Sequence, residues 1–277
     1  MKVSCIIPCL YHVDGEYLKV CVESLRASGF VGQIIVVTNG SKDKPILKHI
    51  GGISVHIHTH DQGQCVAVNV GAQMAEVAAD YLMVSNADMY YAPGWDRNLR
   101  FNGLVFSPNL VEPTDNLGSA PPFLKLDAGF TLDRFNKEKV DKFVAKETGK
   151  FIGPKEESGF NLPFFIRRDV WRTIGGYDTA YDPWGSNSDT DLQTMINLAG
   201  ITPVRLRDVL VYHFSNKSGT FEGHQDYWQK NWNYFDGKWG FNRDSLGSDV
   251  WTNKDMLPDP EDIKYEPEWA WKYLDEE

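Results

Sequence analysis

A lone carboxylate follows a hydrophobic, strand-like segment near the end of the first third of the chain. The segment Tyr81–Ser85 reads YLMVS, and Asp88 comes soon after it, preceded by Asn86 and Ala87. In open α/β sheets, ligands bind at the carboxyl ends of the strands, which is where this carboxylate would lie. A carboxylate there can hold a divalent cation that neutralises a diphosphate. The competing interpretation is an aspartate that only begins a turn.

Two further aspartates, Asp189 and Asp191, begin a segment with helical periodicity that ends before Gly200. A positioned carboxylate can take the proton of a reacting hydroxyl and so act as a general base. The same carboxylates can also serve the helix, since its first turn favours negative charge behind a serine cap at Ser186 or Ser188. The two uses are compatible, so Asp189 stays a candidate for catalysis.

Histidines occur at two places where they could bind a metal. His213 follows the predicted strand Val204–Tyr212, where a neutral imidazole can be a metal ligand or a structural residue. His56, His58 and His60 alternate and therefore share one face of a strand. No carboxylate or cysteine has a matching spacing, so a solvated strand face is favoured over a metal cluster there.

The first 85 residues alternate between strand-like and helix-like segments. This order is typical of right-handed βαβ units with a parallel sheet. The predicted strands are Val3–Pro8, Gln33–Thr38, Ile53–His58 and Tyr81–Ser85, and the predicted helices are Tyr17–Ala27 and Gln64–Ala78.

The second half is less regular. Four prolines punctuate Ser107–Lys125, which predicts loops over the site. We expect a surface helix over Arg134–Lys146, a strand over Gly159–Ile166, a helix over Arg168–Ile174 and a helix over Asp189–Leu198. From about His224 the chain is rich in aromatic residues. These patterns predict an α/β fold with a mixed, mainly parallel sheet flanked by helices, in a single domain with an aromatic-rich C-terminal extension.

Length and composition limit the function. The chain has 277 residues with 42% hydrophobic residues, enough for one large core, and a net charge of −10. That charge gives no general basic field, so nucleic acid is not an expected partner. The four cysteines lie in the first quarter without a CxxC pair, which predicts reduced thiols. No bilayer-spanning run or signal-peptide pattern is present, so we expect a cytoplasmic protein, with peripheral membrane contact left open.

Several short segments, taken in order, resemble the motifs of family 2 glycosyltransferases of the GT-A fold. Asn86–Asp88 stands where that family has its DXD motif, and the similarity extends from Val3 to about Gly240. The other segments are Val3–Tyr11, Ile34–Asp43, Gly63–Gly71, Phe165–Asp178, Trp184–Leu192, Val211–His213 and Phe235–Gly240.

The resemblance implies a metal-dependent, inverting hexosyltransferase that moves a sugar from a nucleotide-diphosphate donor to a hydroxyl of a glycan or glycoconjugate. It implies Mn²⁺ or Mg²⁺ at Asp88 and His213, with Asp189 as catalytic base. It places the acceptor at Trp184 and Gly185. The implied donor contacts are Pro8, Cys9, Leu10, Asn39, Gly63, Asn69, Asn86, Ala87 and Asp88.

Three positions depart from the family pattern. Asn86 replaces the usual first aspartate, Asn39 replaces an aspartate of the base-recognition turn, and Ser188 replaces an acidic residue before the base. The amide oxygen of Asn39 can still accept the uracil N–H, which favours a UDP-sugar. Two alternatives remain: a noncatalytic carbohydrate-binding module and a sugar nucleotidyltransferase. A sugar nucleotidyltransferase would carry a glycine-rich, basic phosphate loop after its first strand, and this chain has no such loop after Val3–Pro8.

We expect the chain to divide where its composition changes, near His224. Residues 1–223 form the predicted glycosyltransferase domain, with a nucleotide-binding half at 1–106 and an acceptor half at 107–223, and residues 224–277 form the extension. Trp228, Trp232 and Trp239 in the extension are predicted to serve mostly packing rather than sugar binding. Lys217 lies in a predicted loop, where it is either a diphosphate contact or a solvated lysine.

Overall fold

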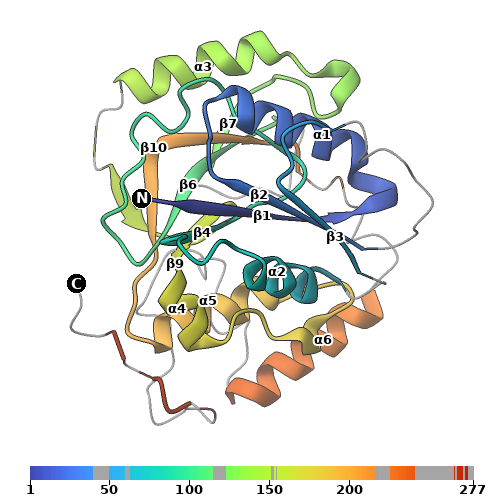
Figure 1. Ribbon diagram of the computed structural model, residues 1–277, viewed down its shortest axis with the longest axis vertical. Coiled ribbons are helices and arrows are strands. Elements are labelled where there is room, and N and C mark those ends of the chain that lie inside the picture. Colours follow the sequence, from blue (N-terminus) through green and yellow to red (C-terminus); the bar gives the residue numbers. More distant parts are fainter. Residues whose placement is uncertain are drawn as a thin grey trace.

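The computed structural model describes residues 1–39, 50–59, 63–114, 123–150, 153, 155–215, 217, 225–240, 265, 267–270, 272 and 273, without the side chains of residues 10–14. One mixed sheet runs through these residues, in the order β3-β2-β1-β4-β9-β6-β10-β5. Helices α1 and α3 cover one face, and α2, α4, α5 and α6 lie on the other (Figure 1). Two hydrophobic clusters fill the space between the sheet and these layers.

The first half of the sheet is parallel, as predicted. Strand β1 pairs with β2 on one side and with β4 on the other, and β2 pairs with β3. The strands are β1 (Val3–Leu10), β2 (Gln33–Asn39), β3 (Val55–Thr59) and β4 (Tyr81–Val84), and the helices between them are α1 (Tyr11–Ala27) and α2 (Gly63–Gln73). Helix α1 thus begins before the predicted Tyr17, and α2 ends before the predicted Ala78.

The second half adds antiparallel strands. Strand β9 lies antiparallel between β4 and β6, and β5 pairs antiparallel with β10, while β6 and β10 are parallel. The predicted mixed, mainly parallel sheet flanked by helices is therefore confirmed. These elements are β5 (Met89–Tyr90), β6 (Val105–Glu112), β7 (Leu124–Lys125), η2 (Leu132–Arg134), α3 (Lys137–Lys150), β8 (Glu156–Ser158), β9 (Phe164–Arg167), α4 (Arg168–Ile174), η3 (Thr179–Tyr181), α5 (Ser188–Leu198), β10 (Val204–His213) and α6 (Gln225–Trp239).

The prediction of loops over Ser107–Lys125 was wrong for its first part. Strand β6 is buried along its whole length and contains Pro108. Proline interrupts a ladder because it has no N–H, so it is tolerated beside irregular pairing. Strand β10 shifts its register between Leu206 and Leu210, opposite Pro108 and Asn109. Residues 115–122 of the predicted loops lie outside the described residues.

The predicted strand Gly159–Ile166 was also too long, because β9 begins only at Phe164. Side chains, rather than a backbone ladder, hold the preceding residues to the sheet. The Asn161 amide donates to the carbonyl of Pro108 at 3.0 Å and accepts from Arg205 Nε at 2.9 Å. Polar side chains that compete with ladder bonds in this way are hard to recognise from a hydrophobic pattern.

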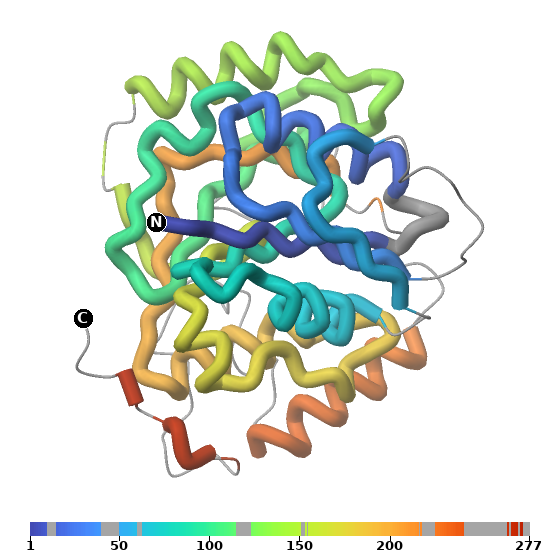
Figure 2. Tube along the Cα trace, viewed as in Figure 1, coloured from blue at the N-terminus to red at the C-terminus, as the bar shows by residue number. Residues whose placement is uncertain are grey.

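The C-terminal helix α6 packs onto the fold through one buried face, formed by Asn231, Phe235 and Trp239. Figure 2 shows α6 running beside the segment that leads into α5. Farther on, the Tyr273 N–H donates to the carbonyl of Ala199 at 2.8 Å. Within the described residues, no helix combines the length and apolar character that a bilayer crossing needs.

Candidate functional site

Asp88 lies in the turn between β4 and β5, at the carboxyl end of the parallel strands. Only 8% of the residue is exposed. Its backbone carbonyl accepts the Phe214 N–H at 3.0 Å, and Met89 pairs with His213 across β5 and β10. The short antiparallel pairing therefore places His213, from the far end of the sequence, beside this carboxylate.

His213 lies between two carboxylates. Its Nε2 is 3.4 Å from Asp88 Oδ1, and its Nδ1 is 3.1 Å from Glu112 Oε1. Burial alone would lower the pKa of His213, but Asp88 and Glu112 outweigh it and raise this pKa to about 10. Burial alone would raise the pKa of Asp88, and His213 together with the Lys217 backbone N–H brings it below its ordinary value.

Glu112 was not predicted from the sequence. It ends the buried strand β6, just as Asp88 follows β4, but the neighbouring prolines led to a loop prediction there. With its Nδ1–H donating to Glu112, His213 directs Nε2 toward Asp88. Such a carboxylate partner commonly fixes the tautomer of a metal-binding histidine. The signal available in the sequence was a hydrophobic run, VFSPNLV, that ends in a carboxylate.

These residues fit a divalent cation. His213 Nε2 and Asp88 Oδ1 lie 3.4 Å apart, and the raised pKa of His213 puts a proton between them at neutral pH. A divalent cation would take the place of that proton. The carboxylate oxygen suits manganese or magnesium, whereas an imidazole nitrogen is the more usual ligand of zinc, copper, iron or nickel. Among the residues the structure describes, no three His, Cys, Asp or Glu side chains converge as a complete metal site. The remaining ligands would have to come from the substrate or water.

Asn86 and Ala87 complete the turn that holds Asp88. Ala87 is buried and Asn86 is partly exposed. The carbonyl of Asn86 accepts from Ser85 Oγ at 3.0 Å and from Cys21 Sγ at 3.5 Å. The first bond lies within the turn itself, and the second ties the turn to α1.

The predicted donor contacts at the ends of β1 and β2 lie side by side. Leu10 pairs with Asn39 in the parallel ladder, directly after Pro8 and Cys9. Asn39 is buried, and its Nδ2 donates to the carbonyl of Gly63 at 2.8 Å. The Asn39 oxygen, which the uracil prediction invokes, is not the atom used in that bond. Residues 40–43 of the predicted base turn lie outside the described residues.

Gly63 begins α2 and contacts the second half of the chain. Its φ is +83°, and a Cβ there would lie 2.3 Å from Asp182 Oδ1. The Asp182 carboxylate accepts the N–H groups of Cys65 at 3.0 Å and Val66 at 2.8 Å, so it caps α2 from a distant segment. Burial raises the pKa of Asp182, although those bonds oppose the rise. Sequence reasoning did not identify this cap.

Asn69 has both polar atoms of its side chain bonded to one distant residue. Its Nδ2 donates to the Tyr177 carbonyl at 2.7 Å, and its Oδ1 accepts the Tyr177 N–H at 2.9 Å. A contact to the base or ribose would require this clamp to open. With both polar atoms engaged, the Asn69 side chain serves to hold the Tyr177 backbone.

Asp189 and Asp191 differ sharply in their surroundings. Asp189 is partly exposed, and Tyr177 Oη donates to its Oδ1 at 2.6 Å. Burial raises the pKa of Asp189, and the Tyr177 bond opposes that rise. Asp191 is fully buried and accepts from Tyr181 Oη, Lys238 Nζ and Trp239 Nε1 at 3.0, 2.9 and 2.7 Å. The Asp191 carboxylate therefore has a structural role, because these three hydrogen bonds engage it inside the protein.

The predicted serine caps of this helix were wrong. The N-cap residue is Asn187, which has a φ of 66° and no side-chain capping bond. The Ser188 hydroxyl donates back to the Gly185 carbonyl at 2.6 Å, and Ser186 Oγ accepts from Asn231 Nδ2 at 3.0 Å. Ser188 thus bonds within the turn before α5, and Ser186 ties that turn to α6.

The predicted acceptor residues lie in this same entry segment. Trp184 is partly exposed, and its ring centroid is 6.3 Å from that of Tyr227 on α6. Gly185 has a φ of +66°, and its N–H donates to the Tyr181 carbonyl at 3.0 Å. The turn that carries both residues thus leads directly into the helix that carries Asp189.

The predicted histidine face on β3 is partly described. His56 is exposed and His58 is half-buried, and Thr38 Oγ1 contacts His56 Nε2 at 2.9 Å and His58 Nδ1 at 3.1 Å. Burial and His58 lower the pKa of His56. His60 lies outside the described residues.

Comparisons with known proteins agree with this architecture. Residues 4–100 match the profile of Glycosyl transferase family 2. A search of the curated proteins found no match. The crystal structure of Staphylococcus aureus TarS 1-349 is similar, with a TM-score of 0.54 and 14% identity over 78% of this chain and 61% of TarS. That of GalNAc-T7 with UDP, GalNAc and Mn²⁺ has a TM-score of 0.52 and 15% identity, over 77% of this chain and 44% of GalNAc-T7.

The predicted resemblance to family 2 glycosyltransferases of the GT-A fold is confirmed by these matches. The chain spans less than two thirds of either similar structure.

Proposed function

We propose that this chain is a metal-dependent, inverting glycosyltransferase that transfers a sugar from a UDP-sugar to an acceptor hydroxyl. The match of residues 4–100 to the family 2 glycosyltransferase profile and the similar fold support the reaction class. The observation that carries the proposal is the pairing of Asp88 with His213 at the carboxyl ends of the strands, where diphosphates are bound in such sheets. A GT-A structure with UDP and Mn²⁺ supports the choice of donor and metal by analogy.

In the proposed site, Asp88 and His213 hold the cation and Glu112 orients His213. A bound Mn²⁺ or Mg²⁺ would neutralise the charge that develops on the departing diphosphate. The nucleoside is proposed to bind at the ends of β1 and β2, near Pro8, Leu10 and Asn39, which pair in the parallel ladder.

Asp189 is the proposed base. Tyr177 holds its Oδ1, which leaves Oδ2 to accept the proton of the acceptor hydroxyl as that oxygen attacks the sugar carbon. Attack from the face opposite the diphosphate inverts the sugar and requires no covalent sugar on the enzyme. Trp184 and Gly185, at the entry to the same helix, are the proposed acceptor contacts.

Replacing the base tests this assignment. Asp189→Asn should lower transfer by about 10²–10⁴-fold, the usual contribution of a general base, while Mn²⁺-dependent UDP binding stays unchanged by isothermal titration calorimetry. Turnover would be measured with the nucleotide sugar that a donor panel identifies. Asp226→Asn, an exposed aspartate on α6, is the control and should behave as the parent protein. Full turnover in Asp189→Asn would reject this base.

A further inference from the structure

Exposed aromatic side chains gather along α6, beyond the residues that the proposed function uses. Among the described residues, the most exposed aromatic ones are Tyr227, Tyr234 and Tyr265, at 37%, 38% and 44%. The first two belong to α6, and the Tyr265 ring lies 5.5 Å from that of Trp239, the last residue of α6. A buried ring serves packing, whereas an exposed ring leaves its face to a ligand.

Two of these rings continue a row that starts at the proposed acceptor turn. The partly exposed Trp184 ring lies 6.3 Å from the Tyr227 ring. Tyr227 and Tyr234 are nearly two helical turns apart, so they share one side of α6 at about 10.5 Å along its axis. The Tyr234 ring lies 5.1 Å from Tyr181, three residues before Trp184. This aromatic row, Trp184, Tyr227 and Tyr234, therefore follows the line where α6 meets residues 181–184.

The aromatic row is continuous with the proposed base. Gly185 follows Trp184, its carbonyl accepts the Ser188 N–H at 3.0 Å, and Asp189 comes next. Figure 2 shows α6 beginning beside this segment and running toward the C-terminal residues. A ligand with its reactive hydroxyl at Asp189 and a sugar over Trp184 would therefore extend along α6.

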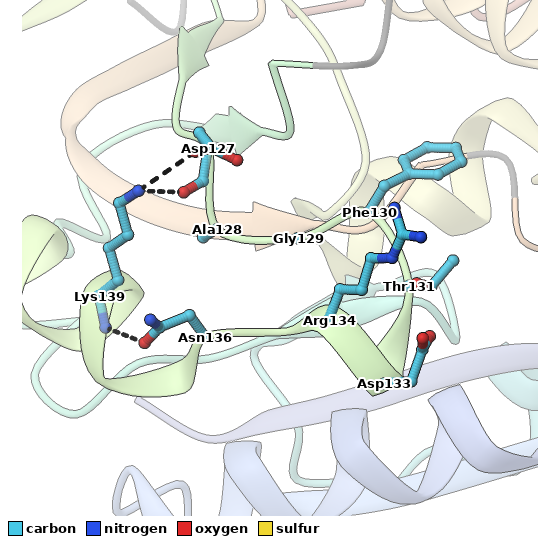
Figure 3. Close-up of a pocket in the computed structure, with 9 residues that line it drawn as sticks. All are labelled: Asp127, Ala128, Gly129, Phe130, Thr131, Asp133, Arg134, Asn136 and Lys139. Carbon is cyan, nitrogen blue, oxygen red and sulfur yellow. Dashed lines mark hydrogen bonds and ion pairs between the residues drawn. The ribbon is translucent and has the colours of Figure 1, made fainter.

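A hollow beside α3 does not continue the acceptor contacts in this way. Figure 3 shows this hollow, which residues between 127 and 139 line. Helices α1 and α3 cover that face of the sheet, whereas α5 and α6 lie on the opposite face (Figure 1). The aromatic row, on the α6 side, lies on the same face of the sheet as the proposed base.

Neighbouring residues hold the Tyr234 ring in place. Its hydroxyl donates to Asp178 Oδ2 at 2.9 Å, and the ring packs edge-on against Tyr181. Gly237, one turn further along α6, has no side chain to cover the ring, and a Cβ there would meet nothing within 4 Å. A ring that is already fixed and open to solvent loses little conformational entropy when a ligand binds.

A sugar chain fits the aromatic row better than another protein does. A stable protein interface buries about 800 Å² on each partner around an apolar centre. The row is narrow, and the exposed Lys230 lies between its two tyrosines. The flat face of a pyranose presents C–H bonds, which the negative face of an aromatic ring attracts, and Lys230 can donate to sugar hydroxyls. The net charge of −10 disfavours a polyanionic chain, which leaves uncharged sugars.

We propose that the aromatic row binds successive sugars of an uncharged oligosaccharide acceptor. The proposal rests on the proposed function, because the row begins at the proposed acceptor contacts. The axial separation of about 10.5 Å between Tyr227 and Tyr234 corresponds to two sugars of an extended chain. An acceptor that uses the whole row is therefore longer than a disaccharide.

Alanine and phenylalanine variants at the same positions separate ring stacking from other effects. Tyr227→Ala and Tyr234→Ala remove a ring. Tyr227→Phe and Tyr234→Phe keep the ring, and Tyr234→Phe gives up only the hydrogen bond to Asp178. Val77→Ala, which shortens an exposed apolar side chain outside α6, is a further control.

Each protein would be saturated with UDP and Mn²⁺ and titrated calorimetrically with cello-, xylo-, malto- and N-acetylated chito-oligosaccharides, from the monosaccharide to the hexasaccharide. The parent protein should bind at least one series more tightly as the chain lengthens from disaccharide to tetrasaccharide. Each alanine variant should bind that tetrasaccharide about tenfold more weakly, whereas the phenylalanine variants and Val77→Ala should match the parent protein.

The proposal is overturned if the parent protein gains no affinity with length in any series, or if the alanine and phenylalanine variants bind the tetrasaccharide equally. The affinity of each variant for UDP with Mn²⁺ checks its fold, and if one alanine variant fails to fold the other decides the result. Failure of the parent protein to bind UDP with Mn²⁺ is a different result, which would reject the proposed function itself.

Discussion

Tyr177 gives the proposed base its most specific contact. It is buried, its hydroxyl donates to Asp189 at 2.6 Å, and Asn69 holds its backbone through two bonds. A hydrogen bond to the ionised form of a carboxyl lowers its pKa. Cys65 faces this pair, and burial raises the pKa of its thiol, with Asp182 adding to the rise.

Removing this hydrogen bond should move the acid limb of the pH–rate profile. Asp189 must be ionised to accept a proton, and in Tyr177→Phe burial would raise its pKa without opposition. The rate should therefore reach its plateau at higher pH than in the parent protein. The measurement is the transfer rate across pH at saturating donor.

The control for this prediction is Tyr181→Phe, which removes a similar buried hydroxyl bond from Asp191. It should lower stability but leave the acid limb in place. An unmoved limb in Tyr177→Phe would show that the tyrosine does not tune the group that limits the rate.

Helix α6 is the element that joins the C-terminal region to the α5 segment. Lys238 Nζ contacts Asp178 Oδ2 at 2.8 Å and Asp191 Oδ2 at 2.9 Å, and Asn231 Nδ2 donates to the carbonyls of Tyr181 and Ser186. The Lys238 and Asp191 side chains are 11% and 1% exposed. Breaking a buried pair by removing one partner typically costs about 3–5 kcal/mol.

Lys238→Met should therefore lower the free energy of unfolding by about 3–5 kcal/mol at neutral pH, because it leaves the Asp191 carboxylate buried without its cation. Urea denaturation followed by circular dichroism would measure this change. Lys230→Met, on the exposed face of the same helix, should change stability by no more than about 0.5 kcal/mol. Equal effects of the two variants would refute a special role for the buried pair.

The cost of Lys238→Met should also depend on pH. Burial already raises the pKa of Asp191, with Lys238 opposing the rise, so the variant raises this folded-state pKa further above its unfolded value. The native state then takes up a proton more readily, and stability is gained as pH falls and lost as pH rises through the folded pKa. Urea titrations at pH 5 and pH 7 should show a smaller deficit at pH 5.

Elements with plain periodicity could be predicted from the sequence, and elements held by side chains could not. Helix α4 spans the predicted range, Arg168–Ile174, and ends before Gly175. The parallel strands follow their hydrophobic runs. Strand β6 was missed because Pro108 is tolerated only through an irregularity in β10, a partner far along the chain. The family resemblance predicted Asp88 and His213 at one metal, but Glu112, which contacts His213, was not predicted.

At the scale of the whole molecule, charge decides how an anionic donor can bind. The protein carries a net charge of −10, and Asp88, Glu112 and Asp189 add local negative charge at the proposed site. Under the proposed function, a nucleotide diphosphate would therefore need a bound cation to enter this region. Binding to the native state alone raises stability by about 2.7 kcal/mol when the ligand is at 100 times its Kd.

UDP should accordingly raise the thermal unfolding midpoint by several degrees with Mn²⁺ present and leave it unchanged in EDTA. Asp88→Asn should abolish this stabilisation, whereas Asp96→Asn, an exposed aspartate elsewhere, should retain it. Differential scanning fluorimetry makes the comparison. Stabilisation by UDP that is equal with and without metal would contradict the proposed role of Asp88.

The contacts of α6 bear on where this polypeptide can be shortened. A fragment ending near residue 223 would lack Lys238, so the buried Asp191 carboxylate would lose its cationic partner. It would also expose the apolar surfaces that Phe235 and Trp239 cover. The amino-acid composition changes near residue 224, but the folded unit does not end there, because α6 stabilises the region before it. A deletion series should find that the shortest piece able to fold extends past Trp239.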